Sequence, residues 1–383
     1  MEHGKIAARQ FMILVVMFII GSSILLVPAA LGAQAKQDAW MSAIVGVAIG
    51  LGIIVLLSAV GNRLPSLSLV EACKVLLGQW LGTAVAVLFV IHSFFLAVFM
   101  LRYIGDFMAT QIMPETPVEA IHIVFIILVI MASKYGLETF ARSAEIFLPW
   151  VLLFLIVLTL FVLPQMHVDN LMPVMQKGFA PVLKGSLPLI GIPYLELVLF
   201  LMIYPHVDDA SKRRRAFLLG GAIGGTMIIL VTILTLSVLG PYLTVRNIYP
   251  SFALTKKINI GQFLQRIEAL LAITWFLTIF FKTTVTFYVS ALGFAQIFKL
   301  KRYQSVLVPL GFLTAIYALI VYPDIVYGIR FAGTIWTPYA AVYGLLLPLV
   351  LLGIAMLRKI GGRGQSKGGP LSDNPDRKPP HSK

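Results

Sequence analysis

Charged residues are scarce in this chain, at 12% of its 383 residues. A soluble globular protein carries about 25%, so this chain has too few charges to cover a water-facing surface of ordinary size. Hydrophobic residues account for 59% of the sequence, and apolar runs recur along nearly its whole length. This composition excludes a soluble protein and predicts one integral membrane domain.

Cysteine is also nearly absent. Cys73 is the single cysteine, so an internal disulfide is impossible. We expect it to be a small, inert residue in a cytoplasmic loop. The sequence lacks a phosphate-binding loop, a Cys/His metal spacing and a nucleophile elbow, so we expect no enzyme activity, no metal and no cofactor. The first apolar run is too long for a cleavable signal peptide.

The apolar runs are long enough for ten membrane-spanning helices, since about 20 apolar residues cross a bilayer. We therefore assign residues 1–357 to a transmembrane, permease-like domain. Residues 358–383, rich in Gly, Pro, Lys and Ser, are expected to form a disordered basic cytoplasmic tail. The predicted spans are 9–31, 39–60, 80–111, 118–133, 142–163, 186–204, 216–240, 266–298, 304–322 and 335–357.

Basic residues predict the orientation of these spans. About 20 Lys and Arg residues lie in the loops and tail on one side and about 8 on the other. The positive-inside rule then places both termini in the cytoplasm. The same rule accounts for most of the net charge of +14, so the charge does not indicate a nucleic acid partner. In the tail, the basic residues are expected to anchor on anionic lipid, with binding of a partner as the alternative. The smaller, outer set includes Lys184, Arg246 and Arg330.

Two apolar segments contain residues that break helices. The first has Gly21-Ser22-Ser23 with Pro28 close behind, and the second has Pro188, Gly191 and Pro193. A helix in lipid must satisfy its own backbone groups, so such clusters at membrane depth need a reason. In one group of transporters, broken helices expose peptide groups that bind a small charged ligand near the midplane.

The spacing of these segments favours an inverted repeat. One opens the first span and the other opens the sixth, and five spans in each half give the halves opposite topology. The alternative for Gly21-Ser22-Ser23 is a close helix contact through small residues. The alternative for the second segment is a helix that is kinked but continuous.

Two charged residues lie deep in predicted spans, where charge is expensive. Glu196 follows the second proline cluster, and Lys282 lies in the eighth span beside Thr283 and Thr284. Glu196 is a candidate for pairing with a ligand ammonium, for pairing with Lys282, or for carrying a proton. The amine of Lys282 is a candidate for replacing a bound cation in a polar pocket. A structural polar contact for Glu196 and a snorkelling Lys282 remain the alternatives.

The predicted third span places His92, Tyr103 and Asp106 on one helix face. His92 is either a buried structural residue or part of a ligand pocket. Arg102 lies four residues before Asp106, and we expect these two to form an interfacial ion pair rather than a substrate site.

Four stretches of the sequence resemble the spore germination permease family, the B subunit of germinant receptors, in the amino acid–polyamine–organocation superfamily. The residues that carry this resemblance are Gln10-Phe11 with Ile20-Gly21-Ser22 and Gln37-Asp38-Ala39-Trp40; Pro193-Tyr194-Leu195-Glu196 with Ile203-Tyr204-Pro205; Ile248-Tyr249-Pro250 with Ile260-Gly261-Gln262-Phe263; and Arg266-Ile267-Glu268 with Trp275.

The resemblance implies an all-α, ten-span fold of the LeuT type, with a 5+5 inverted repeat and with helices 1 and 6 broken. It implies a pocket for a small nutrient such as an amino acid, formed by Gly21, Ser22 and Ser23, by the second break including Gly191, Ile192 and Tyr194, and by Thr283 or Thr284. It also implies an A-type membrane subunit and a C-type lipoprotein subunit as partners, in the spore inner membrane. A secondary amino acid or amine transporter, with or without proton coupling, remains open, as does a channel for water or small ions.

Overall fold

The computed structural model describes residues 4–257 and 268–360, and the regular elements within these ranges are all helical. The α-helices are α1 (Ala8–Ala35), α2 (Ala39–Arg63), α3 (Leu69–Leu77), α4 (Gln79–Phe107), α5 (Val118–Tyr135), α6 (Leu137–Val162), α7 (Phe179–Leu189), α8 (Ala210–Arg246), α9 (Pro250–Lys256), α10 (Glu268–Ile297), α11 (Gln304–Ile320), α12 (Ile325–Thr334), α13 (Trp336–Ala341) and α14 (Leu347–Leu357). Shorter 3₁₀ or π segments are η1 (Lys36–Asp38), η2 (Met108–Ile112), η3 (Leu163–Gln165), η4 (Val168–Leu171), η5 (Ile190–Tyr194), η6 (Leu195–Met202), η7 (Tyr204–His206) and η8 (Val342–Leu346).

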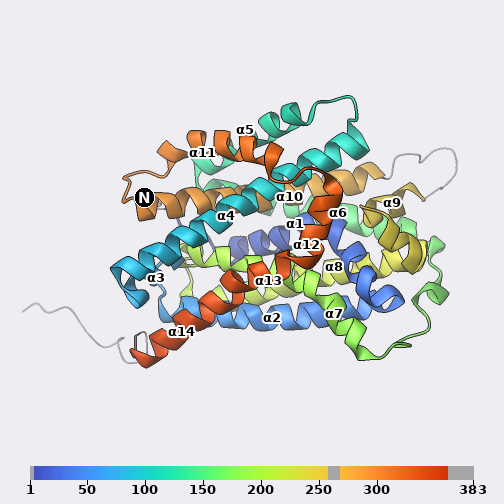
Figure 1. Ribbon diagram of the computed structural model, residues 1–383, viewed down its shortest axis with the longest axis horizontal. Helices are drawn as coiled ribbons and strands as arrows, with labels where there is room; N and C mark the ends of the chain where they lie inside the picture. Colours follow the sequence, from blue (N-terminus) through green and yellow to red (C-terminus); the bar gives the residue numbers. More distant parts are fainter. Residues whose placement is uncertain (1–3, 258–267, 361–383) are drawn as a thin grey trace, which may run out of the picture.

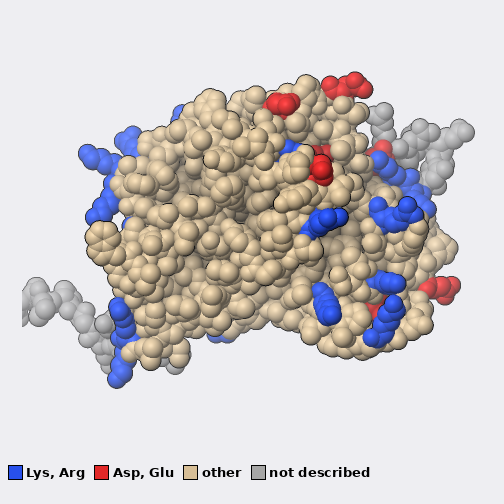
Figure 2. Space-filling model, in the orientation of Figure 1, with Lys and Arg blue, Asp and Glu red and all other residues tan. Residues whose placement is uncertain are grey.

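Most long helices run along the longest axis of the molecule (Figure 1). Figure 2 shows that charged side chains on the viewed face gather toward the two ends of this axis, with a largely uncharged band between them. This is the charge distribution of a protein whose middle lies in hydrocarbon. Most of the tail after Arg358, and part of the resembling stretches between Ile260 and Ile267, lie outside the described residues.

The described residues contain eight helical segments that are long and apolar enough to cross a membrane, or nine when the α11–α12 pair counts as one span. The first segment, Ala8–Arg63, has 56 residues. At about 1.5 Å per residue it is far longer than the roughly 30 Å of a bilayer core. It holds two helices, α1 and α2, joined by η1. Counting these two separately, and the α11–α12 pair as one span, gives ten candidate spans among the described residues, the number predicted from the sequence.

Tyr204 shows that α1 and α2 are antiparallel. Its ring lies 6.0 Å from that of Phe11, near the start of α1. Its hydroxyl donates to Asn62, at the end of α2, at 2.8 Å. The start of one helix and the end of the next therefore lie at the same end of the molecule, as two consecutive membrane crossings require.

Helix α1 is central to the bundle, and glycines on α8 allow it to pack closely. Gly220 and Gly224 lie one helical turn apart on α8, on the side that faces α1. A Cβ atom on Gly220 would lie 2.8 Å from Val15 Cβ, and one on Gly224 would lie 2.9 Å from Ile19 Cβ. Small residues at this spacing are typical of close helix contacts in membranes.

The first span differs from the expectation of a broken helix. Helix α1 continues through Gly21, Ser22 and Ser23 and through Pro28. Pro28 lacks the N–H that would bond the carbonyl of Ile24, and the hydroxyl of Ser251 on α9 donates to that carbonyl at 2.5 Å instead. The backbone of α1 is thus satisfied by the protein itself, and a break is not required.

The α geometry of the sixth span is interrupted where the sequence predicts, but the segment remains helical from Phe179 to Met202, which matches the alternative of a continuous helix rather than an unwound break. Regular α geometry ends at Leu189; η5 has π geometry with Pro193 inside it, and η6 is 3₁₀. The interruption frees carbonyl groups for other donors. The Thr337 hydroxyl donates to Leu187 O at 3.2 Å, and the Lys282 ammonium donates to Ile192 O at 3.4 Å.

Cys73 lies in α3, not in a loop, which corrects the expectation from the sequence. Ser68 and Glu71 form a reciprocal capping box that begins this helix, and Cys73 is fully buried on its inner face. Burial raises the pKa of the Cys73 thiol to about 12. The buried thiol is therefore inert, as expected.

Candidate functional site

A cavity of about 80 Å³ lies at the centre of the helix bundle. Its walls come from α1, α4, the interrupted sixth span, the α11–α12 bend, α12 and α13. Most of the lining is apolar, and the polar exceptions include Ser22 and Glu196. Five aromatic side chains line it: Phe99, Tyr103, Tyr322, Phe331 and Trp336.

An ion pair lies in the wall of this cavity. The ammonium of Lys282 is 2.6 Å from Oε2 of Glu196, and the two side chains are 0% and 1% exposed. The same ammonium donates to Ser22 Oγ at 2.6 Å and lies 4.7 Å above the Phe18 ring. Lys282 therefore connects α1, η6 and α10 through its polar contacts.

The second oxygen of the Glu196 carboxylate is also occupied. Trp336 Nε1 donates to Glu196 Oε1 at 3.0 Å. Since Trp336 begins α13 and lines the cavity, the carboxylate joins the interrupted sixth span to the last span. A buried charge pair is favourable only when its remaining hydrogen-bonding positions are filled in this way.

Gly21 gives Lys282 room to reach Ser22. A Cβ atom on Gly21 would lie 3.0 Å from Lys282 Cβ and 3.1 Å from its Cδ. The Gly-Ser pair therefore serves as a small-residue contact between α1 and α10 and also supplies an acceptor to the ammonium. This is the alternative that the sequence had left open for the first segment.

His92 lies near the cavity but does not line it. Its ring stacks on Tyr343 at 4.2 Å and on Trp336 at 6.0 Å, and it is buried. Neither ring nitrogen has a hydrogen-bond partner among the described residues. His92 therefore supports the Trp336 side of the site through ring packing.

Of the predicted site residues in the sixth span other than Glu196, one lines the cavity and two do not. Ile192 lines the cavity, whereas Tyr194 faces α8 and donates to Gly221 O at 2.9 Å. Gly191 allows close approach of Thr337, whose Cα would lie 3.0 Å from an added Cβ. The structure thus brings Ser22, Ile192 and Glu196 together at the cavity, with Lys282 directly behind them.

Three hydroxyl residues adjoin Ser22 and Lys282 in the sequence. Thr283 donates to the Ile279 carbonyl of its own helix at 2.8 Å. Ser23 Oγ and Thr284 Oγ1 are buried and have no partner among the described residues. These two hydroxyls therefore remain available to another polar atom.

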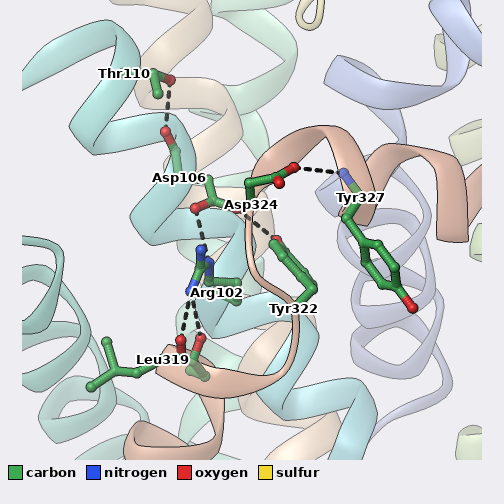
Figure 3. Close-up of polar contacts among 8 residues, drawn as sticks. Arg102, Asp106, Thr110, Leu319, Tyr322, Asp324 and Tyr327 are labelled. Atoms are coloured by element: carbon green, nitrogen blue, oxygen red, sulfur yellow. Dashed lines mark hydrogen bonds and ion pairs between the residues drawn. The ribbon is translucent and has the colours of Figure 1, made fainter.

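A second polar cluster holds the bend between α11 and α12 (Figure 3). The two helices form an angle of 99°. Arg102 pairs with Asp106 at 2.9 Å, as expected, and donates to the Leu319 carbonyl at 2.9 Å near the end of α11. Tyr322 donates to the other Asp106 oxygen at 2.6 Å, and the Arg102 guanidinium lies 4.7 Å above its ring.

This cluster determines where α12 lies relative to the cavity. Tyr322 and Phe331 line the cavity, and the Phe99 ring stacks on both, at 6.4 and 5.5 Å. Sequence reasoning did not identify Tyr322, Phe331 or Trp336 as site residues. Tyr322 lies on the bend, Phe331 on α12 and Trp336 at the start of α13. All three rings contact Phe99 of α4, and no local pattern in the sequence indicates such contacts.

A wider recess, here called the vestibule, adjoins the cavity on the other side of α12. Its volume is about 630 Å³, and it shares Leu26, Ile192, Ile329 and Ala332 with the cavity lining. Its remaining wall comes from the C-terminal part of α1, from α7, from the end of α8 with residues 247–248, and from more of α12. The vestibule and the cavity thus share part of their walls.

Comparison of the sequence with known proteins agrees with the resemblance found in the sequence. A family model described as "Spore germination protein" matches residues 5–324. The Bacillus subtilis (strain 168) protein named "Spore germination protein KB" is 28% identical over 314 residues, which cover 81% of this chain and 83% of that protein.

Two solved transporter structures share the fold. MhsT, in complex with L-phenylalanine, matches with a TM-score of 0.69 at 14% identity, over 94% of this chain and 97% of that one. Mhp1, a nucleobase-cation-symport-1 family transporter, matches with a TM-score of 0.69 at 10% identity, over 93% and 79%. The architecture is therefore the LeuT-like one that the sequence predicts.

Proposed function

Because the chain belongs to the spore germination protein family, we propose that it is the ligand-sensing membrane subunit of a germinant receptor. In this proposal a small nutrient, such as an amino acid, binds in the cavity between α1, α4, the interrupted sixth span and α12. Binding triggers germination and does not serve to feed the cell. The protein lies in the spore inner membrane with both termini in the cytoplasm.

The observation that carries the proposal is the ion pair in the cavity wall. Glu196 lines the cavity, while Lys282 approaches it from behind at 2.6 Å. A ligand ammonium in the cavity would meet the same carboxylate and compete with Lys282 for it. Such a competition converts the arrival of a small cationic group into a change in the contacts of a buried side chain.

Loosening Lys282 would affect three spans. Its ammonium holds Ser22 of α1 and the Ile192 carbonyl of η5, and its stem packs against Gly21. A ligand that weakened its bond to Glu196 would change how α10 packs on α1 and on the interrupted span. In the proposal, this rearrangement is passed to an A-type membrane subunit and a C-type lipoprotein subunit.

The fixed amine has a second consequence. Two hydroxyls that have no partner within residues 4–257 and 268–360, those of Ser23 and Thr284, lie on the same two helices as Ser22 and Lys282. We propose that the ammonium takes the place of a bound cation between α1 and α10. The receptor then needs no external ion to hold these helices together.

The second candidate function is secondary transport of an amino acid or amine. The observation that favours it is the fold shared with MhsT and Mhp1. Both functions use the same cavity, so the cavity does not separate them.

The discriminating experiment deletes the gene and measures two responses. Spores are tested for germination against a panel of nutrients, and growing cells are tested for uptake of the same compounds. We expect the deletion to remove the germination response to at least one nutrient and to leave uptake unchanged. Normal germination with every nutrient, together with loss of uptake of one, would replace the receptor by the transporter.

A further inference from the structure

Three basic side chains line the vestibule. Lys184 comes from α7, Arg246 from the end of α8, and Arg330 from α12. Three separate helices thus bring one positive charge each to a single recess. In Figure 2, basic groups lie over the region where Figure 1 shows α12 and α7.

No carboxylate balances these charges within the described lining. Lys184 and Arg330 form no ion pair with any described residue. The guanidinium of Arg246 donates to the Tyr242 hydroxyl and lies 5.1 Å from the centre of its ring, so these contacts do not involve a carboxylate. The segment 258–267, which the structure does not describe, contains no Asp or Glu in its sequence.

Three carboxylates on the elements around the cavity already have partners. Glu196, at the cavity, pairs with Lys282, and Asp106 pairs with Arg102. Asp324 caps α12 by accepting from the Tyr327 amide at 2.8 Å, and it does not line the vestibule. The cavity is therefore close to neutral, while the vestibule carries three positive charges.

These charges act together because the recess is small. A volume of about 630 Å³ has a linear dimension close to one Debye length, which is about 8 Å at physiological ionic strength. Low-dielectric walls of one charge sign concentrate the field and raise the local concentration of the opposite ion. An anionic group that enters the vestibule therefore feels all three charges.

We propose that the vestibule is a capture site for the carboxylate of the ligand. This deepens the proposed function and rests on it, because it assigns the ligand to a chemical class: a small molecule with a free carboxylate and an apolar portion. The three basic groups attract the carboxylate, and the apolar portion then meets Leu26, Ile192 and Ile329, which lead into the cavity.

Simple anchoring of these side chains to lipid headgroups predicts a different arrangement. Snorkelling Lys and Arg side chains extend outward to the bilayer surface around a membrane protein. Here the three groups face a shared recess that continues into the protein interior through Ile192 and Ala332. A phospholipid phosphate shares the anionic chemistry, so the experiment must separate the two sources.

Cysteine reporters measure the local potential without knowledge of the ligand. Gly333 and Ala33 line the vestibule, and a Cβ atom on Gly333 meets no other atom within 4 Å. Gly333→Cys and Ala33→Cys are each modified in nanodiscs with an anionic and a cationic methanethiosulfonate reagent. Thr139→Cys serves as the control, because it lies beside the exposed pair of Arg142 and Glu138. The native cysteine is buried, so the unmodified chain supplies the blank.

The proposal predicts that the anionic-to-cationic rate ratio is at least about tenfold higher at the vestibule reporters than at the control. Replacing Lys184, Arg246 and Arg330 together by Gln should bring the ratio down to the control value. Sodium acetate should slow the anionic reagent more than acetamide with sodium chloride at equal ionic strength. An equal ratio at all sites, or a lack of protection by acetate, would overturn the proposal.

Two further outcomes identify the source of the anion and keep the two proposals separate. If the high ratio disappears in nanodiscs that contain anionic lipid, a headgroup occupies the vestibule and the carboxylate assignment fails. The reagent rates do not depend on germination. A failed reporter test with an intact nutrient phenotype would therefore refute the capture site alone, and a passed reporter test without a phenotype would refute the receptor alone.

Discussion

The buried pair of Glu196 and Lys282 allows a quantitative prediction about stability. Removing one partner of a buried ion pair leaves the other charge uncompensated, which costs about 3–5 kcal/mol. We predict losses of this size in the free energy of unfolding for Lys282→Met and for Glu196→Gln. Methionine preserves most of the apolar stem that packs on Gly21, so the loss reports mainly on the charge.

The double variant Lys282→Met/Glu196→Gln leaves neither charge behind. We therefore expect it to lose less stability than the sum of the single variants, with a coupling energy of about 2–3 kcal/mol, at the upper end of values for contacting pairs. The measurement is unfolding of the purified protein by SDS in mixed micelles. The exposed pair Glu138 and Arg142 gives the control, where removal of both groups should show coupling below about 1 kcal/mol. Additive effects within about 0.5 kcal/mol at the buried pair would refute the reasoning.

Three further predictions follow from individual contacts. Ser251→Ala leaves a buried carbonyl of α1 without a donor and should lower the free energy of unfolding by about 1–3 kcal/mol in the same SDS assay. Adding Pro28→Ala should recover part of this loss, because it restores a backbone donor. If nothing is recovered, the Ser251 hydroxyl does not compensate for Pro28. Tyr322→Phe removes the hydrogen bond to Asp106, so amide hydrogen exchange should be faster in α12 of the variant than in α12 of the unmodified protein, and unchanged in α2. Equal protection of α12 in the variant and the unmodified protein would exclude the cluster as the support of α12. Because the pKa of the Cys73 thiol is about 12, maleimide should label it at a pH of about 8 about 10³-fold more slowly in the folded protein than in SDS. Rapid labelling of the folded protein would show that the thiol is accessible.

The spans were predictable from the sequence because lipid imposes a simple rule. Each crossing needs a long apolar run with satisfied backbone groups, and the observed helices begin and end within a few residues of most predicted limits. Gly and Pro correctly indicated the departure from α geometry between Leu189 and Leu195, although the chain stays helical there. The same signals misjudged α1, since the sequence does not reveal that Ser251 compensates for Pro28.

The candidate site was predictable only in part. Glu196 and Lys282 could be identified because a charge at membrane depth needs a partner. Their pairing was one of several open alternatives. The aromatic wall, with Tyr322 and Trp336, could not be predicted because it depends on the 99° bend between α11 and α12. That bend is held by tertiary contacts to Arg102 and Asp106.

The central claim is that a nutrient in the cavity triggers germination. The most direct test fills the cavity with the substitution Ala332→Phe. The control is Gly353→Phe, which adds the same side chain on α14, where an added Cβ meets no atom within 4 Å. Germination rate is measured against the concentration of each nutrient to which unmodified spores respond but deletion spores do not, with membrane protein levels matched by immunoblot. The account predicts that Ala332→Phe raises the half-maximal concentration at least about tenfold, equivalent to about 1.4 kcal/mol of binding free energy, while Gly353→Phe leaves it unchanged. A normal dose–response in Ala332→Phe spores with normal protein levels would contradict it.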